Sequence, residues 1–432
     1  MGTFHFDPRM MVSGPFINCP KCHHVTFGIL AVHDNSYDRR CKNCLYPKGS
    51  ESSASYVLPE LNKKIIYLDQ FAISNMMKVL NPNTDAYKKG RIDDYWLRLY
   101  ERLDSLCKMQ LITCPDSEFH NNESLVTGFY KQLKRLYELL SHGGTFYGKE
   151  TIKRFQLEEH FINWLDGKED ESIDIDVNSI VRGNINSWTD KFIISVEVEM
   201  NVDLVETIRR IREQTHNGLE GVFQYWHDSK ITDFSYWYRM EIESFGKGII
   251  NEYLKQLNKI MGIEEVESYI ELYPTSSTLM INRMQDILNE RGIEELSSVW
   301  YKITQYFNTA NFGNLPFLHL SASLFASIAR KAGAGRKKPP NKGTANDIEM
   351  ISTLLPYCDA MFIDNECASY MKEKPFSDNI GFPTRIFSQS NKEEFIEYLN
   401  EIESGTPMEH ISKVNEVYGE SWKLPYVTLY KD

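Results

Sequence analysis

Four cysteines lie near the N-terminus in two pairs whose spacing suits a metal site. Cys19 and Cys22 form one Cys-x-x-Cys pair, Cys41 and Cys44 form the other, and 18 residues separate the two pairs. Each pair can form a tight turn that directs two thiolates at one cation, and two such turns complete a tetrahedral shell of four sulfurs. The spacing therefore predicts a structural Zn²⁺ site.

The segment around these cysteines is expected to fold as a small zinc ribbon over residues 1–58, with short strands in VTFGILAV and a Ser-rich linker at 49–58. About fifty residues bury too little apolar surface to be stable alone, so a metal ion would supply the missing stability. Disulfides would need an oxidising compartment, and a redox pair would lie beside a βαβ pattern, so zinc is preferred. His23 and His24 could replace a thiolate, but four cysteines already fill the shell.

Four acidic side chains occupy comparable positions in the remaining chain. Asp69 ends the apolar run KIIYLD, Asp364 ends the run AMFID, and Glu123 and Asp347 lie near the starts of two expected helices. The carboxyl ends of parallel strands meet at the sheet edge where ligands bind, so these acids are expected to converge. Converging carboxylates repel one another unless a divalent cation compensates, and hard oxygen ligands suit Mg²⁺ or Mn²⁺. One or two such ions can activate water for in-line attack on phosphorus.

Alternating strands and helices are needed to position these acids. Compact apolar runs predict strands at 64–69, 110–114, 359–364 and 384–388, and helical segments lie between them. This alternation is typical of a parallel sheet that is covered by helices on both faces. The expected fold class is therefore α/β.

A large helical region is expected to interrupt this sheet domain. Between about 125 and 315, apolar residues recur three and four positions apart with charges between them. This region is expected to form a body separate from the sheet, to carry no catalytic group, and to shape a substrate channel or contact a partner. The predicted domains are the ribbon (1–58), the first part of the α/β domain (59–130), the helical insertion (131–314), the second part of the α/β domain (315–405) and a C-terminal tail (406–432).

The acid-bearing segments resemble the PIN-domain nucleases. Ile-Tyr-Leu-Asp69-Gln-Phe-Ala-Ile-Ser looks like the opening strand of that family with its first catalytic acid. Asn346-Asp347 on a helix, followed by the strand that ends in Asp364-Asn-Glu366, resembles the later part of its site. The segment 115–124 is similar to the region that holds the second acid.

The resemblance covers about 160 residues in two blocks, 62–130 and 315–400. It implies a PIN-like fold and a nuclease that depends on Mg²⁺ or Mn²⁺ and acts most often on RNA. Carried over to this chain, the resemblance implies these metal ligands: Asp69, Glu123, Asp347 and Asp364, with Glu366 as a fifth acid.

The chain departs from the family pattern around the second acid. The helical region separates the second acid from the third, and Asp116, Glu118 and Glu123 all compete for the second position. Glu123 is preferred and Glu118 comes second. His120 lies about one helical turn before Glu123, where it could orient phosphate or water, or make a structural hydrogen bond.

A basic loop precedes Asp347 and is a candidate nucleic-acid contact. The formal net charge of −12 excludes a protein that coats nucleic acid by bulk electrostatics, so contacts would be confined to local patches. The loop is either a solvated surface segment or a contact to phosphates beside the cleavage site. Its cations are Arg336, Lys337, Lys338 and Lys342.

Composition and missing motifs narrow the remaining classes. The chain is 42% hydrophobic and 25% charged, which is typical of a globular protein, and no run of eighteen apolar residues predicts a membrane span, so a cytoplasmic protein is expected. P-loop, GxGxxG, HExxH and GxSxG motifs do not occur. Two alternatives stay open: a flap-type nuclease that acts on DNA, and a non-catalytic PIN-like scaffold that binds nucleic acid or protein. A homodimer or a protein partner could use the helical insertion or the ribbon.

Overall fold

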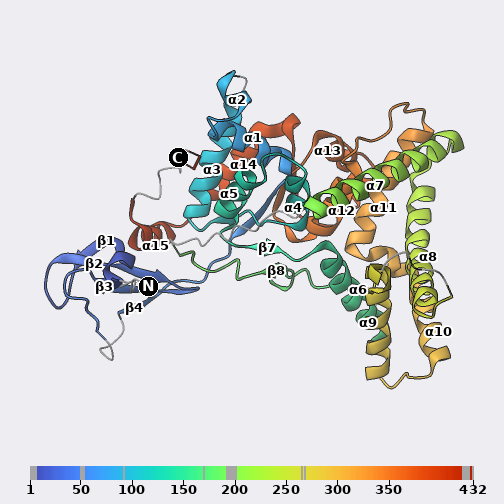
Figure 1. Ribbon diagram of the computed structural model, residues 1–432, viewed down its shortest axis with the longest axis horizontal. Helices are drawn as coiled ribbons and strands as arrows, with labels where there is room; N and C mark the ends of the chain where they lie inside the picture. The colour runs from blue at the N-terminus through green and yellow to red at the C-terminus, as the bar shows by residue number, and fades with distance from the viewer. Residues whose placement is uncertain are drawn as a thin grey trace.

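The structure is a computed structural model that describes residues 7–48, 54–90, 93–168, 171–190, 202–263, 266, 269–420 and 429–430. It is a mixed α/β protein with a parallel sheet, a separate antiparallel sheet and a large helical part (Figure 1). The α/β class expected from the alternating sequence pattern is confirmed.

The parallel sheet has four short strands. Every neighbouring pair is parallel, and Leu68 lies opposite Phe362 in the ladder between the two central strands. The strands, in spatial order, are β10 (Arg385–Phe387), β9 (Ala360–Phe362), β5 (Lys64–Leu68) and β6 (Ile112–Thr113).

The central strands are buried on both faces. Successive side chains of a strand point to opposite sides of the sheet, so each strand contributes to an apolar cluster on either side. Ile66 and Leu68 of β5 pack into one apolar cluster, and Ile65 and Tyr67 pack into another. The first cluster includes α1 (Gln70–Leu80), α3 (Tyr95–Lys108), α5 (Tyr130–Ser141) and α14 (Lys392–Ser404). The second includes α11 (Pro316–Gly333), α12 (Thr344–Leu354) and α13 (Asn365–Lys372).

The N-terminal sheet packs against the body of the protein. Val32 and Tyr37 belong to the first apolar cluster, and the buried Arg39 donates to the Glu416 carbonyl oxygen at 3.0 Å. Glu416 lies on α15 (Met408–Tyr418), so the C-terminal helix covers this sheet (Figure 1). The antiparallel strands are β1 (Ser13–Asn18), β2 (Val25–Val32), β3 (Ser36–Cys41) and β4 (Ser55–Val57), paired in chain order.

The range predicted as a helical insertion, 131–314, contributes to more than one core. Part of it has its own apolar cluster, which joins α6 (Lys149–Leu165), α8 (Phe234–Ile260), α9 (Ser276–Glu290) and α10 (Leu296–Phe307). By contrast, α5 packs against the sheet, and so does the two-stranded ribbon of β7 (Thr145–Phe146) and β8 (Val181–Arg182). The region is helical as predicted, but much of its first part belongs to the sheet domain.

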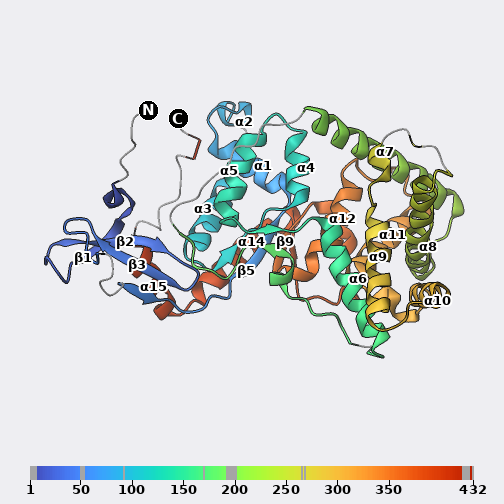
Figure 2. The same ribbon diagram turned by 60° about the horizontal axis from the view of Figure 1, so that its bottom comes forward.

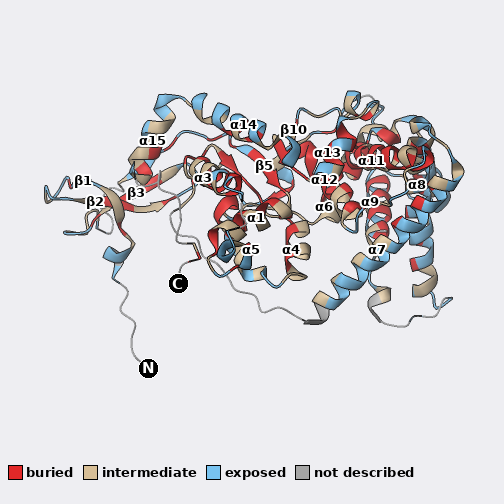
Figure 3. Ribbon diagram, turned by 90° about the horizontal axis from the view of Figure 1, so that it is seen from above, coloured by how far each residue is buried: buried red, intermediate tan, exposed pale blue. Residues whose placement is uncertain are grey.

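The long helix α7 (Val202–Ser229) precedes α8 in the chain and packs against the sheet domain. Its C-terminal half buries Leu219, Phe223 and Trp226 in the second apolar cluster. Its N-terminal half is largely exposed and approaches α4 (Glu118–Leu125) (Figures 2 and 3). A single helical turn, α2 (Asp85–Lys88), lies between α1 and α3 in the chain. Among the described residues, no helix has both the length and the apolar character needed to cross a membrane.

Candidate metal centre at the carboxyl edge of the parallel sheet

Asp69 and Asp364 are brought together because they follow the two central strands. Leu68 and Phe362 end β5 and β9 as partners in the ladder, and the Asp69 N–H donates to the Phe362 carbonyl oxygen at 2.9 Å. Asp69 immediately precedes α1, and Asp364 immediately precedes α13. The carboxyl edge of the sheet therefore carries a carboxyl group from each central strand.

Two helices add one acid each to this edge. Glu123 lies on α4, which the Ser117 side chain caps, and Asp347 lies in the first turn of α12. Both acids interact electrostatically with Asp69. The four acids predicted from the sequence thus lie within electrostatic reach of one another, while the ligand atoms that lie within 4.8 Å of one another belong to Asp347, Asp364 and Cys367. We call Asp69, Glu123, Asp347 and Asp364 the carboxylate cluster.

The acids of the carboxylate cluster oppose one another's ionisation. Burial, with the nearby charges of Glu123 and Asp364, raises the pKa of Asp69 to about 7. Burial raises the pKa of Asp347 well above its ordinary value, and the other three acids raise it further. Burial also raises the pKa of Glu123. A divalent cation would offset this repulsion and would find the oxygen ligands that it prefers.

The two carboxylate oxygens of Asp364 have different surroundings. Oδ1 caps α13, since it accepts hydrogen bonds from the N–H groups of Glu366 at 2.6 Å and Cys367 at 3.1 Å. Oδ2 is buried and has no hydrogen-bond partner within the described part of the chain. Asp347, Asp364 and Cys367 each offer a ligand atom, and these atoms lie within 4.8 Å of one another. This group could hold a metal ion.

The raised pKa of Asp69 predicts a pH effect on the metal-free protein. From about pH 4 to pH 7 the unfolded chain loses the Asp69 proton while the folded chain keeps it, so this group lowers the free energy of unfolding as the pH rises. Relative to Asp69→Asn, the wild type should lose on the order of 3–4 kcal/mol over this range. Urea denaturation of both proteins at several pH values measures the difference. A difference that is constant from pH 4 to pH 8 would contradict the expectation, and added Mn²⁺ at pH 7.5 should stabilise the wild type more than the variant.

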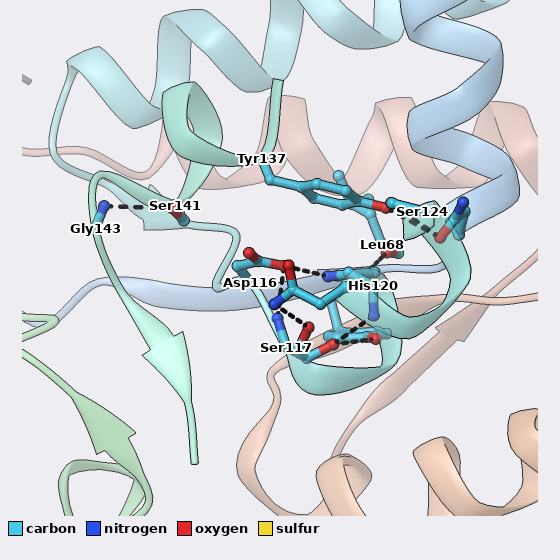
Figure 4. A network of polar contacts seen from close by, with 11 residues as sticks. Leu68, Asp116, Ser117, His120, Ser124, Tyr137, Ser141 and Gly143 are labelled. Atoms are coloured by element: carbon cyan, nitrogen blue, oxygen red, sulfur yellow. Dashed lines mark hydrogen bonds and ion pairs between the residues drawn. The ribbon is translucent and has the colours of Figure 1, made fainter. Parts of the chain in front are cut away.

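His120 supports the end of β5 from the protein interior (Figure 4). Its side chain is 3% exposed and lies between the rings of Tyr67 and Tyr137, at centroid distances of 4.7 and 4.4 Å. Nε2 donates to the Leu68 carbonyl oxygen at 2.7 Å, and Nδ1 lies 3.1 Å from Oδ1 of Asp116. The nearby imidazole lowers the pKa of Asp69 and of Glu123.

Replacing His120 by Asn should therefore destabilise the protein and raise the pKa of Asp69 further. The change breaks a buried ion pair and leaves the Leu68 carbonyl oxygen without its donor, which should cost about 2–4 kcal/mol of unfolding free energy. Urea denaturation checks the value. Asp116→Asn and the double variant complete a cycle in which the second change should add much less than it does alone. Additive effects would show that the two side chains do not act as a pair.

The other acids considered from the sequence are held in separate contacts. Oε2 of Glu118 accepts a hydrogen bond from the Lys149 N–H at 3.1 Å, at the start of α6. Oε1 of Glu366 accepts from Nη2 of Arg336 at 2.6 Å and from the Tyr370 hydroxyl at 2.8 Å. These contacts explain the positions of both carboxylates without a metal ion.

The basic loop lies between α11 and α12, and its four cations differ in environment. The Arg336 guanidinium is engaged by Glu366, and its Nε donates to the Lys338 carbonyl oxygen at 2.7 Å. The side chains of Lys337, Lys338 and Lys342 are exposed. Arg336 therefore ties the loop to α13, while the three lysines are open to solvent.

The four N-terminal cysteines form a second group that could hold a metal ion, which we call the cysteine cluster. Cys19 and Cys44 have their sulfurs 3.7 Å apart, and Cys22 and Cys41 have theirs 3.6 Å apart, well beyond a disulfide bond of about 2.05 Å. A backbone hydrogen bond from His24 lowers the pKa of the Cys22 thiol to about 5, whereas burial raises the pKa of the Cys44 thiol to about 12. Thiolates are the form in which cysteines bind zinc.

Two residues at the carboxylate cluster were not singled out from the sequence. Cys367 lies three positions after Asp364, a spacing that places both on one side of α13. Nη2 of Arg212, on α7, lies 3.4 Å from Oε1 of Glu123. The signal for Arg212 was its place between Ile208 and His216, on the side of an amphipathic helix that faces the protein.

Comparison of the chain with protein-family models, with curated proteins and with solved structures found no match. Inference about function therefore starts from the carboxylate cluster and the cysteine cluster themselves.

Proposed function

We propose that the protein is a metal-dependent nuclease with a PIN-like fold, which hydrolyses phosphodiester bonds in RNA at the carboxylate cluster. The observation that carries the proposal is the buried Oδ2 of Asp364, which lacks a partner in the described part of the chain, on a residue that forms a group of potential ligands with Asp347 and Cys367. A carboxylate oxygen in that position is costly unless a cation or a proton meets it.

The residues suit Mg²⁺ or Mn²⁺ as the cation. Asp69, Asp347 and Asp364 would supply oxygen ligands, and Glu123 would complete the cluster from α4. A bound divalent cation lowers the pKa of water and stabilises the charge that develops on phosphorus. Cys367 is buried and its thiol pKa is raised well above the usual value, so it adds no negative charge to the metal-free site.

The cysteine cluster suits a structural Zn²⁺ ion, and residues 1–58 would then be a zinc ribbon. Four sulfur donors in two turns match the tetrahedral preference of zinc. The Arg39 and Tyr37 contacts to α15 would fix this ribbon on the body of the protein.

The test is cleavage of labelled single-stranded RNA, structured RNA and matched DNA by the purified full chain. Because a strong chelator would also remove zinc, the metal-free arm uses buffer without added divalent cation, and the zinc content is measured alongside. RNA cleavage is expected with Mg²⁺ or Mn²⁺ and not without them. Attack by water leaves no 2′,3′-cyclic phosphate, so cyclic ends or metal-independent cleavage would contradict the proposal. Cleavage of DNA alone would support the flap-type alternative.

A further inference from the structure

We propose that α7 brings one cation, Arg212, to the site and that Arg212 binds a phosphate group of the nucleic-acid strand beside the scissile bond. This inference rests on the proposed nuclease function and names a residue that positions the substrate. The helical region was expected from the sequence to contribute no group to the site, and Arg212 is the observation that changes this view.

One end of α7 is fixed on the protein, and the other end reaches the site. Leu219, Phe223 and Trp226 anchor its C-terminal half in the second apolar cluster. The turn after α7 is seated on α11, because a Cβ at Gly333 would lie 2.1 Å from the Ile231 carbonyl oxygen. From this anchor the helix extends past α12 to α4, where the carboxylate cluster lies (Figure 2).

One side of α7 faces the protein and is partly buried. Successive residues of an α-helix are rotated by about 100° around the helix axis. By this measure Ile208 and Leu219 lie on the same side of α7 as Arg212, within roughly 40° of it, and Arg209 lies roughly 60° from it. The acidic residues of the same turns, Glu206 and Glu213, lie further round the helix, towards solvent. The protein-facing stripe of α7 is therefore apolar on both sides of Arg212, which places a single cation where the stripe passes the acids.

The Arg212 guanidinium can bind a further group in addition to Glu123. The Arg212 side chain is 24% exposed, and within the described part of the chain its hydrogen bond to Glu123 is a long one, 3.4 Å from Nη2 to Oε1. A guanidinium has five N–H donors in a planar fork that matches two oxygens of a phosphate. The Arg212 charge also lowers the pKa of Glu123 and of Asp347, so it acts on two members of the carboxylate cluster. A phosphate between α7 and the cluster would meet this positive group.

The experiment compares Arg212→Gln with Arg210→Gln in the full chain. Arg210 is exposed and lies roughly 160° from Arg212 round the helix, so its replacement is a matched control for charge. Three quantities are measured: the Kd for a labelled single-stranded RNA at several salt concentrations without divalent cation, the Kd for Mn²⁺, and the single-turnover cleavage rate. Arg212→Gln should weaken RNA binding about tenfold and reduce the slope of log K against log salt by about one, while Arg210→Gln changes both much less.

The outcomes separate this proposal from its alternatives. Arg212→Lys keeps the charge but not the fork, and should recover the salt slope with only part of the affinity. If Arg212 serves only as a counter-ion of Glu123, Arg212→Gln will change Mn²⁺ affinity and leave RNA binding unchanged, which overturns the proposal. Equal losses for Arg210→Gln and Arg212→Gln overturn it as well. If the wild type binds RNA through Arg212 but cleaves neither RNA nor DNA, the nuclease proposal fails while the phosphate contact stands.

Discussion

Asp364→Asn is expected to lower the single-turnover rate of RNA cleavage by about a hundredfold or more. The substitution keeps the shape of the side chain and its Oδ1, and asparagine caps helices as well as aspartate does, so α13 should begin as before. What disappears is the negative charge that a divalent cation needs at the sheet edge. A loss of this size is typical when one group that stabilises the transition-state charge is removed.

Asp359→Asn is the matched control for this change. Asp364 follows the carboxyl end of β9, and Asp359 directly precedes the other end of that strand. Asp359 pairs there with Lys64 at 2.7 Å. Its replacement should leave the rate within about twofold. Both variants should retain the wild-type circular dichroism and zinc content. Full activity in Asp364→Asn, or equal losses in the two variants, would place the chemistry elsewhere.

Loss of the cysteine cluster is expected to have the largest effect on folding. Cys19→Ser combined with Cys41→Ser removes one thiolate from each pair, and both cysteines are buried. Structural zinc contributes roughly 10–16 kcal/mol of apparent binding free energy in small zinc domains, so the double variant should lose the ordered N-terminal sheet. Elemental analysis should give about one zinc per wild-type chain and almost none in the variant.

Hydrogen exchange locates this loss within the chain. Amides of β2 and β3 should exchange much faster in the double variant, while those of β5 and β9 stay protected. Cys107→Ser is the control, because Cys107 is buried in the sheet domain and outside the cysteine cluster. It should keep the zinc. A double variant with unchanged zinc content would show that the cysteines do not bind it.

The central part of the fold was predictable because its signal is local. β5 and β9 are apolar runs that end directly before an acid, and parallel pairing brings those ends together whatever the rest of the chain does. The run 110–114 was predicted at five residues but yields the two-residue strand β6. After Thr113 the chain turns towards α5, and the Cys114 N–H donates to the Leu140 carbonyl oxygen instead of extending the ladder.

Contacts between distant segments could not be predicted from local pattern. Nothing near Arg212 in sequence indicates that it meets Glu123, because that contact depends on how α7 is anchored on α11. The basic loop was predicted as a group of four cations, yet Arg336 pairs with Glu366 on the neighbouring helix. His120 had two interpretations, and its burial between two tyrosine rings supports the structural one. In each case tertiary packing decides the role of a residue whose type is compatible with several.

The most direct test of the account is anomalous scattering from crystals of the full chain grown with Mn²⁺. We expect a manganese peak about 2.2 Å from carboxylate oxygens of Asp364 and Asp347, with Asp69 close enough to bind the same ion or a second one. A zinc peak at the cysteine cluster in the same crystal serves as the internal reference. A zinc peak without manganese at the carboxylate cluster, at saturating Mn²⁺ and neutral pH, would contradict the metal centre on which the proposed activity depends.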